Sequence, residues 1–286
     1  MRHFFIAFLL FTPILLFAQS NSSVDSSSNL SRRAIRKQKI AERKTHLNKL
    51  IAEEEEGALV YRKQSAYALK LNTDGMSFYY EHGKYKSMNR TNLWWVEFGE
   101  KKNQKQNKQT PQPTLTNYPG FSIISVGNNF VFGKVNNLYP LKIGFGRQYL
   151  IGNKGTTNGI AITAAYGGGV SFGIVKPYFL QVVDSTSNTE ISDIRYNQNP
   201  SEFLDPNSIV GASSLSKGIP HITVIPGLHL RGSLRFDYGR YRESLSALEI
   251  GFNADYYANK ISIMANNPSS NLFGDVYLAL VFGRRK

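Results

Sequence analysis

Apolar and polar side chains alternate one by one along most of the chain. In residues 66–72, Tyr67, Leu69 and Leu71 fall on one face of an extended backbone, and small or polar residues fall on the other. Successive side chains of a β-strand point to opposite faces, so this period of two predicts strands and not helices. The same period returns in residues 244–257 and in other segments, which indicates an all-β protein.

Turn residues divide this pattern into ten predicted strands. The first two are joined by Thr73-Asp74-Gly75, which is a hairpin signal. A count of eight stays open, if the first hairpin is not part of the wall. The ten predicted strands are residues 65–72, 76–86, 91–100, 129–136, 139–150, 157–167, 170–182, 220–236, 244–257 and 270–283.

The alternation favours an antiparallel transmembrane β-barrel. After residue 19, no segment approaches the ~20 consecutive apolar residues that a membrane helix needs. Polar and charged residues alternate with aromatic and aliphatic ones in nearly every strand, and no amphipathic helices are present to cover a sheet. A barrel that is apolar toward lipid and polar inside predicts this pattern. A soluble β-sandwich is the alternative.

The lengths of the connections favour a barrel of the bacterial outer membrane. Residues 101–128, 183–219 and 258–269 are long connections that fall on one side, whereas the connections on the other side are short. Long outer loops and short periplasmic turns are the rule in such barrels. We therefore expect residues 61–286 to form an outer-membrane barrel whose N-terminus lies in the periplasm.

The first 60 residues differ in composition from the barrel. Residues 1–19 combine a short basic start with an apolar run, which predicts a signal peptide, with an uncleaved anchor as the alternative. Residues 20–60 predict a polar leader and a short basic helical extension in the periplasm, the helix covering residues 31–56. This helix is a candidate docking element through Arg32, Arg33, Arg36, Lys37, Lys39, Arg43 and Lys44.

Charged residues of both signs occupy the predicted interior face of the barrel. Unpaired buried charge is very costly, so these side chains are expected to pair and to fill a narrow lumen. A conducting pore, the alternative, would need a wider lumen and a bias toward one sign. The predicted interior network consists of Lys70, Glu81, Glu97, Lys142, His229, Arg231, Arg235, Glu249, Asp255 and Asp275.

The net charge of +14 is unevenly distributed. Part of it lies in the basic helix, and another part lies in the predicted outer loop. Nucleic acid is the usual partner of such a basic protein, but the signal peptide argues against it. Lipid phosphates, including those of lipopolysaccharide, are the expected partners of the loop, and a solvated charge run is the alternative. The predicted loop residues are Lys101, Lys102, Lys105 and Lys108.

The sequence contains no signature of catalysis or of metal binding. There is no cysteine, and none of the five histidines has the spacing of a metal motif. Glu81 and His82 would point to opposite faces of a strand and so cannot act as one acid–base pair there. We therefore predict a protein that is not an enzyme and that needs no cofactor and no metal.

Four motifs combine aromatic strand residues with glycine. They are WVEFGEKK (95–102), FVFGKVNNLY (130–139), GFGRQ (144–148) and the ending VYLALVFG (276–283). These motifs resemble a family of outer-membrane barrels from Bacteroidota, over residues 60–286. The resemblance implies an accessory role in an envelope complex, such as the machinery for outer-membrane protein assembly or the type IX secretion apparatus.

The expected function is therefore that of a non-enzymatic barrel subunit that docks to protein partners in the envelope. Two alternatives remain open. The barrel could bind or modify lipopolysaccharide through its lysine-rich loop, or it could form a small pore.

Overall fold

A computed structural model describes two compact units, Met1–Ile51 and Ala52–Lys286, and the second contains all the strands. The predicted signal peptide (1–19) lies outside the described residues, as do Arg32 and Arg33 of the predicted docking helix. The described residues are 35–45, 48, 61–87, 89–111, 114–118, 121–125, 127–154, 159–183, 191–240 and 243–286.

In the first unit, residues 35–45 are helical, so a short basic helix precedes the strands. The rest of the predicted helix, residue 48 apart, lies outside the described residues, and its docking role stays a prediction. No helix in the described part of the chain is long and apolar enough to cross a membrane. The predicted docking residues that are described are all exposed: Arg36, Lys37, Lys39, Arg43 and Lys44.

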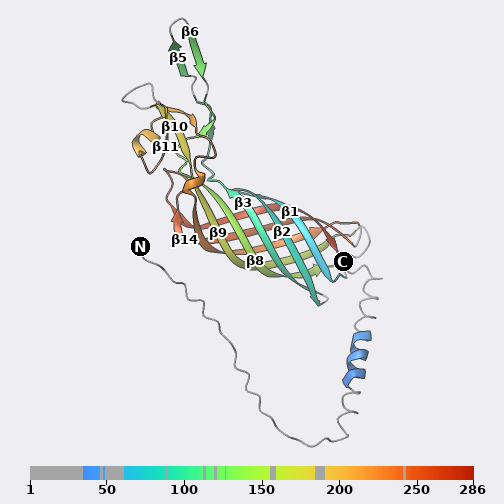
Figure 1. Cartoon of the computed structure of the whole chain (residues 1–286). Coiled ribbons are helices and arrows are strands. Elements are labelled where there is room, and N and C mark those ends of the chain that lie inside the picture. The colour runs from blue at the N-terminus through green and yellow to red at the C-terminus, as the bar shows by residue number, and fades with distance from the viewer. Residues whose placement is uncertain are drawn as a thin grey trace, which may run out of the picture. The chain divides into compact units, whose positions relative to one another are not determined.

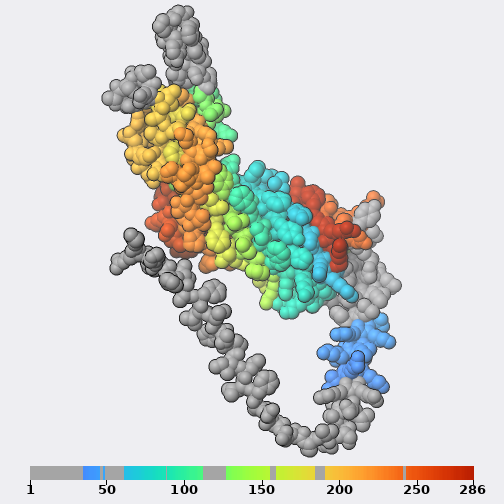
Figure 2. Space-filling view, in the orientation of Figure 1, coloured from blue at the N-terminus to red at the C-terminus, as the bar shows by residue number. Residues whose placement is uncertain are grey.

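Eight antiparallel strands of the second unit close into a barrel (Figure 1). Their order around the wall is β1-β15-β14-β13-β9-β8-β3-β2. The barrel is closed because the first strand pairs with the last, from Gln64↔Arg285 to Asn72↔Tyr277. These two strands adjoin on the surface in Figure 2, as cyan beside red. The wall consists of β1 (Lys63–Asn72), β2 (Gly75–Ser87), β3 (Arg90–Lys101), β8 (Asn136–Gly152), β9 (Ala161–Pro177), β13 (Thr223–Asp237), β14 (Ser244–Ile261) and β15 (Ser270–Arg285).

The predicted antiparallel β-barrel is confirmed, with eight strands in place of ten. The first hairpin belongs to the wall, so the reason given for the lower count was wrong. Two other features reduce the count. The predicted strand 129–136 contains β7 (Phe130–Val131) and only the first residue of β8, and the segments 157–167 and 170–182 are largely one continuous strand, β9. The run Gly167-Gly168-Gly169 was interpreted as a break but continues the strand.

The two ends of the barrel carry connections of different length. We call the end where β1 begins and β15 finishes the terminal end, and it also carries the connections 88–89, 153–160 and 238–243. At the opposite end, which we call the loop end, the chain makes the tight turn 73–74 and three longer connections. Those three are residues 102–135, 178–222 and 262–269. The predicted separation of long connections from short ones is therefore present in the structure.

Side chains alternate across the wall as the sequence pattern requires. Leu69 is 52% exposed on the outer face, whereas its neighbour Lys70 is 0% exposed inside. Every strand of the wall carries exposed apolar or aromatic side chains on its outer face, as in Phe78, Phe145 and Phe252. In water, this outer face would expose a continuous apolar surface to solvent. The barrel is therefore suited to a lipid environment.

The longer connections at the loop end fold into smaller elements. Residues 178–222 form a three-stranded sheet and a short helix, which we call the cap, and its apolar core includes Leu180, Val182, Phe203 and Ile209 together with Phe130. The elements of these connections are β4 (Lys108–Gln109), β5 (Thr114–Tyr118), β6 (Phe121–Ser125), β7, β10 (Phe179–Val183), β11 (Ile191–Arg195), α2 (Pro200–Phe203), β12 (Ile209–Ala212) and the 3-10 helix η1 (Ile219–His221).

Replacing Phe203 with alanine should loosen the cap and leave the barrel intact. Phe203 is 0% exposed, and its ring packs edge-on against Tyr196 at 5.8 Å. Removing a buried ring costs about 3–5 kcal/mol, more than so small a core can lose. Limited proteolysis should then cut residues 191–212 rapidly, while the barrel strands stay protected. Equal protease resistance of variant and parent would contradict this expectation.

Candidate functional site

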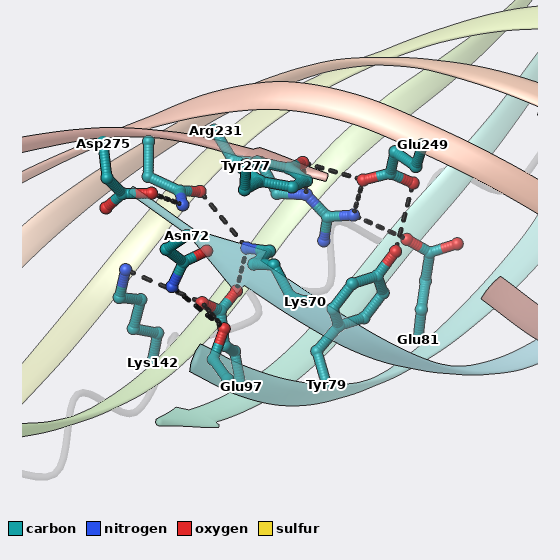
Figure 3. Close-up of polar contacts among 12 residues, drawn as sticks. Lys70, Asn72, Tyr79, Glu81, Glu97, Lys142, Arg231, Glu249, Asp275 and Tyr277 are labelled. Atoms are coloured by element: carbon teal, nitrogen blue, oxygen red, sulfur yellow. Dashed lines mark hydrogen bonds and ion pairs between the residues drawn. The ribbon is translucent and has the colours of Figure 1, made fainter. Parts of the chain in front are cut away.

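The barrel interior contains a charged cluster around two guanidinium groups and two carboxylates. Glu249 accepts hydrogen bonds from Arg231 at 2.5 Å and from Nε of Arg235 at 2.8 Å. Arg235 also holds Glu81 through both terminal nitrogens, at 2.9 and 3.1 Å. Tyr277 donates a further hydrogen bond to Glu249 at 2.7 Å (Figure 3). All these side chains come from β2, β13, β14 and β15, and the alternation of those strands turns them inward.

A second cluster lies nearer the loop end and is organised by lysines. Lys70 donates to Glu97 at 2.6 Å, and Lys142 donates to Asp255 at 2.9 Å (Figure 3 labels Lys70, Glu97 and Lys142). Lys101 forms three ion pairs, with Asp74 at 2.7 Å, Asp275 at 2.6 Å and Asp255 at 3.2 Å.

A third, smaller group lies at the terminal end. Arg285 pairs with Asp237 at 2.6 Å, and Lys154 approaches the same carboxylate at 3.6 Å. The three groups together hold equal numbers of acidic and basic side chains. The paired residues are Asp74, Glu81, Glu97, Asp237, Glu249, Asp255 and Asp275 with Lys70, Lys101, Lys142, Lys154, Arg231, Arg235 and Arg285.

The structure places all ten residues of the predicted interior network inside the barrel, and each is at most 5% exposed. It joins nine of them in the ion pairs above. His229 is the tenth, and its Nδ1 lies 3.2 Å from the carbonyl oxygen of Val170. These placements agree with the sequence pattern, while any functional role of the residues stays a prediction.

The sequence interpretation missed several members of the network and misplaced one. Lys101 was assigned to an exposed lipid-phosphate loop, but it is 2% exposed and belongs to the second cluster. This is a correction: Glu97, Gly99 and Lys101 continue one inward period to the end of β3, and three carboxylates hold the lysine there. The same period could have identified Asp237 after Arg235.

The other lysines of the predicted loop face solvent. Lys102, Lys105 and Lys108 are all exposed, and Lys102 pairs with Glu100 at 3.2 Å. The structure does not bring these lysines together with the interior network. Their affinity for lipid phosphate stays a prediction.

Glycines make room for the largest interior side chain. Trp95 is 2% exposed and lies against Gly144, Gly146 and Gly167 of the neighbouring strands. Its ring packs edge-on against His229 at 5.8 Å. The glycine motifs are therefore packing features of the wall, because any side chain at these positions would occupy the space of the indole.

An apolar cluster covers the charged interior at the loop end. It gathers residues of β8, β9, β13 and β14 with residues of the connections 102–135 and 262–269. Tyr257, which is 0% exposed, packs edge-on against Phe273 at 5.9 Å, and the ammonium of Lys101 lies 5.9 Å from the centre of the Phe273 ring. The interior charges are thus excluded from solvent.

Polar contacts hold the cap together and tie it to the connection 102–135. Lys217 donates to Asp193 at 2.8 Å, which holds the pKa of that carboxyl below its usual range. Burial lowers the pKa of the Lys134 ammonium, which lies 5.6 Å from the ring centre of Tyr178. The Tyr178 hydroxyl accepts a hydrogen bond from the backbone of Val131 at 3.2 Å. These contacts order the connections without forming a reactive group.

Histidine and carboxylate side chains do not assemble into a reaction centre in the described part of the chain. Glu81 points inward, whereas His82 points outward and its Nδ1 lies 3.0 Å from the Ser65 hydroxyl, as the alternation requires. No group of three histidine or acidic side chains in the described ranges is arranged to hold a metal ion.

The closed antiparallel wall, the apolar outer face and the ionic interior define a membrane-spanning β-barrel. No protein-family model matches the chain, and no curated protein matches it. Among solved structures, the chain is similar to a major outer membrane protein from Thermus thermophilus (9% identity, 78% of this chain and 98% of the other, TM-score 0.39). It is also similar to Neisserial surface protein A (9%, 78% and 96%, TM-score 0.36) and to Ail, the attachment invasion locus protein of Yersinia pestis (6%, 79% and 99%, TM-score 0.36).

Proposed function

We propose that this protein is a non-conducting outer-membrane barrel that acts as a structural or accessory subunit of an envelope complex. The ion-paired and solvent-excluded interior is the observation that carries the proposal. Because the lumen of this barrel is filled and its charges are balanced, partners can bind only at its external surfaces. Those surfaces are the cap at the loop end and the basic extension that precedes β1.

The connections support an orientation for this barrel. Outer-membrane barrels have short periplasmic turns and longer extracellular loops. The terminal end, with its short connections, therefore faces the periplasm in this proposal, and the cap faces outward. The basic extension then enters the periplasm, where protein partners of an assembly or secretion complex are accessible.

The buried charges favour this role over that of a small pore. Glu81, Lys101, Arg235 and Asp255 are each at most 2% exposed. The ion pairs Arg235–Glu81 and Lys101–Asp255 span the lumen, because they join β13 to β2 and β3 to β14 on opposite sides of the barrel. Ions could pass only if these pairs separated, and separating buried pairs costs several kcal/mol each.

The purified full chain should not conduct ions in planar bilayers. Insertion is verified by protease protection of the barrel strands in vesicles made in parallel, with a general porin as the positive control for conductance. We expect current no greater than that of the bare bilayer. Stable conductance steps from the wild-type protein would contradict the filled-lumen proposal.

The accessory role is tested by purification in mild detergent from the native membrane. The full chain should retain protein partners, and a variant that lacks residues 31–56 should lose them while it still inserts. A wild-type barrel that purifies alone would count against docking. Altered lipid A in a deletion strain would instead favour lipopolysaccharide modification.

A further inference from the structure

A group of basic and aromatic side chains occupies the lipid-facing side of β2, β3, β8 and β9 near the terminal end. Strand pairing sets Lys84 beside Asn92, Asn92 beside Arg147, and Arg147 beside Tyr166. Arg90 pairs with Tyr149 directly below, toward the same end. All these residues belong to the outward period of their strands, so they form one patch on the outer wall.

The hydroxyl groups of two tyrosines in this patch lie next to each other. The rings of Tyr149 and Tyr166 stack with centroids 5.8 Å apart and planes 5° apart. The Tyr166 hydroxyl lies 3.5 Å from that of Tyr149, and Tyr166 is 54% exposed. The arrangement holds two phenolic groups side by side, next to Arg147, where the wall faces lipid.

The positive charge of the patch is not neutralised by the described carboxylates on the outward faces of β2, β3, β8 and β9. Nε of Arg90 is buried and has no hydrogen-bond partner among the described residues. On the outward faces of these four strands the described carboxylates are limited to Glu100, which lies at the opposite end and pairs with Lys102. No described carboxylate of these four strands therefore competes with a negatively charged group from outside the chain.

We propose that this patch binds the phosphate headgroup of an anionic phospholipid in the leaflet that meets the terminal end. Guanidinium groups bind phosphate oxygens with charge-assisted hydrogen bonds, and tyrosines lie at the headgroup level with their hydroxyls toward water. The occupant is a lipid because the patch lies on the outer wall, directly below the apolar side chains Trp94 and Phe145. The inference rests on the proposed membrane location.

Trp94 provides a measurement at the site itself. It is one of only two tryptophans in the chain, it faces outward, and it lies one outward position above Asn92 on β3. The full chain is reconstituted in phosphatidylcholine vesicles that contain brominated phosphatidylglycerol, and Trp94 quenching reports which lipid occupies the patch. A Trp94→Phe variant gives the background from the interior Trp95.

Wild-type protein should prefer the anionic lipid, and each of Arg90→Gln and Arg147→Gln should reduce that preference about fivefold. The matched control is Arg284→Gln, which removes an outward arginine at the same end on β15 and should retain the preference. Equal quenching by anionic and neutral brominated lipid, or an equal loss in Arg284→Gln, would overturn the proposal.

A barrel that is not embedded in the membrane would give a different quenching result. Brominated phosphatidylcholine alone quenches Trp94 if the barrel is embedded, whatever the headgroup preference. The embedded wild-type barrel could instead show no preference for anionic lipid and retain an acidic protein through Arg147 when it is purified from membranes. That result would assign the patch to a protein partner and would also overturn the proposal.

Discussion

Replacing Glu249 with alanine should lower the free energy of unfolding of the barrel by about 3–5 kcal/mol, because it leaves buried charge unpaired. Glu249 is 0% exposed and accepts hydrogen bonds from Arg231, Arg235, Tyr79 and Tyr277. Without it, two guanidinium groups share the single carboxylate of Glu81, which lies 3.7 Å from Arg231. Urea unfolding in lipid vesicles, followed by tryptophan fluorescence, measures the loss.

The matched control for this prediction is Glu100→Gln. The Glu100 side chain is 28% exposed and pairs with Lys102, whose side chain is 49% exposed. Exposed ion pairs contribute about 0–1 kcal/mol, so the unfolding midpoint should scarcely move. Similar losses in the two variants would mean that the interior network contributes no more than a surface pair.

Replacing Gly167 with valine should prevent the barrel from closing around Trp95, at a cost of about 3 kcal/mol or more. A Cβ at this position would lie 2.5 Å from Cα of Gly146 and 2.8 Å from the ring of Trp95. Neither the backbone of β8 nor a fully buried indole can move without opening the wall. The folded fraction is measured by the resistance of the barrel to protease in detergent.

Gly152→Ala is the matched control for the glycine prediction. Its added Cβ would lie 3.8 Å from Cβ of Ile162, which is an ordinary contact distance. This variant should fold as the parent does. A stable Gly167→Val barrel with unchanged Trp95 fluorescence would contradict the packing described here.

The wall of the barrel could be predicted because its physical cause is local. The period of two follows from strand geometry, and one face must suit lipid, so the ten residues of the predicted interior network, from Lys70 to Asp275, could be assigned to the inner face from the sequence alone. The predicted number of strands was wrong where the sequence shows no alternation of apolar and polar residues. Three consecutive glycines carry no apolar period, so a continuous strand looked like two strands and a turn.

The contacts of the interior could not be predicted because they depend on register. Glu249 contacts Arg235 through the pairing of β13 with β14. It contacts Tyr79 across the lumen, although the two residues are 170 positions apart in the sequence. Lys101 shows the same limit: the lysine run that follows it suggested a loop, and only the distant Asp255 and Asp275 explain its burial. Most of the cap was likewise assigned to the connection 183–219, while β10 was included in the predicted strand 170–182, since the short strands of the cap have too few residues to show a period.

The pairing of β1 with β15 determines the order of synthesis and membrane insertion. Its partners, such as Gln64 and Arg285, stand at opposite ends of the barrel sequence, so the ring is incomplete until the final sixteen-residue strand is available. Until then two strand edges would present unpaired amides to hydrocarbon, which the bilayer does not tolerate. Entry into the membrane must therefore follow the synthesis of the chain through β15, and a chain that stops before Ser270 should remain outside the bilayer.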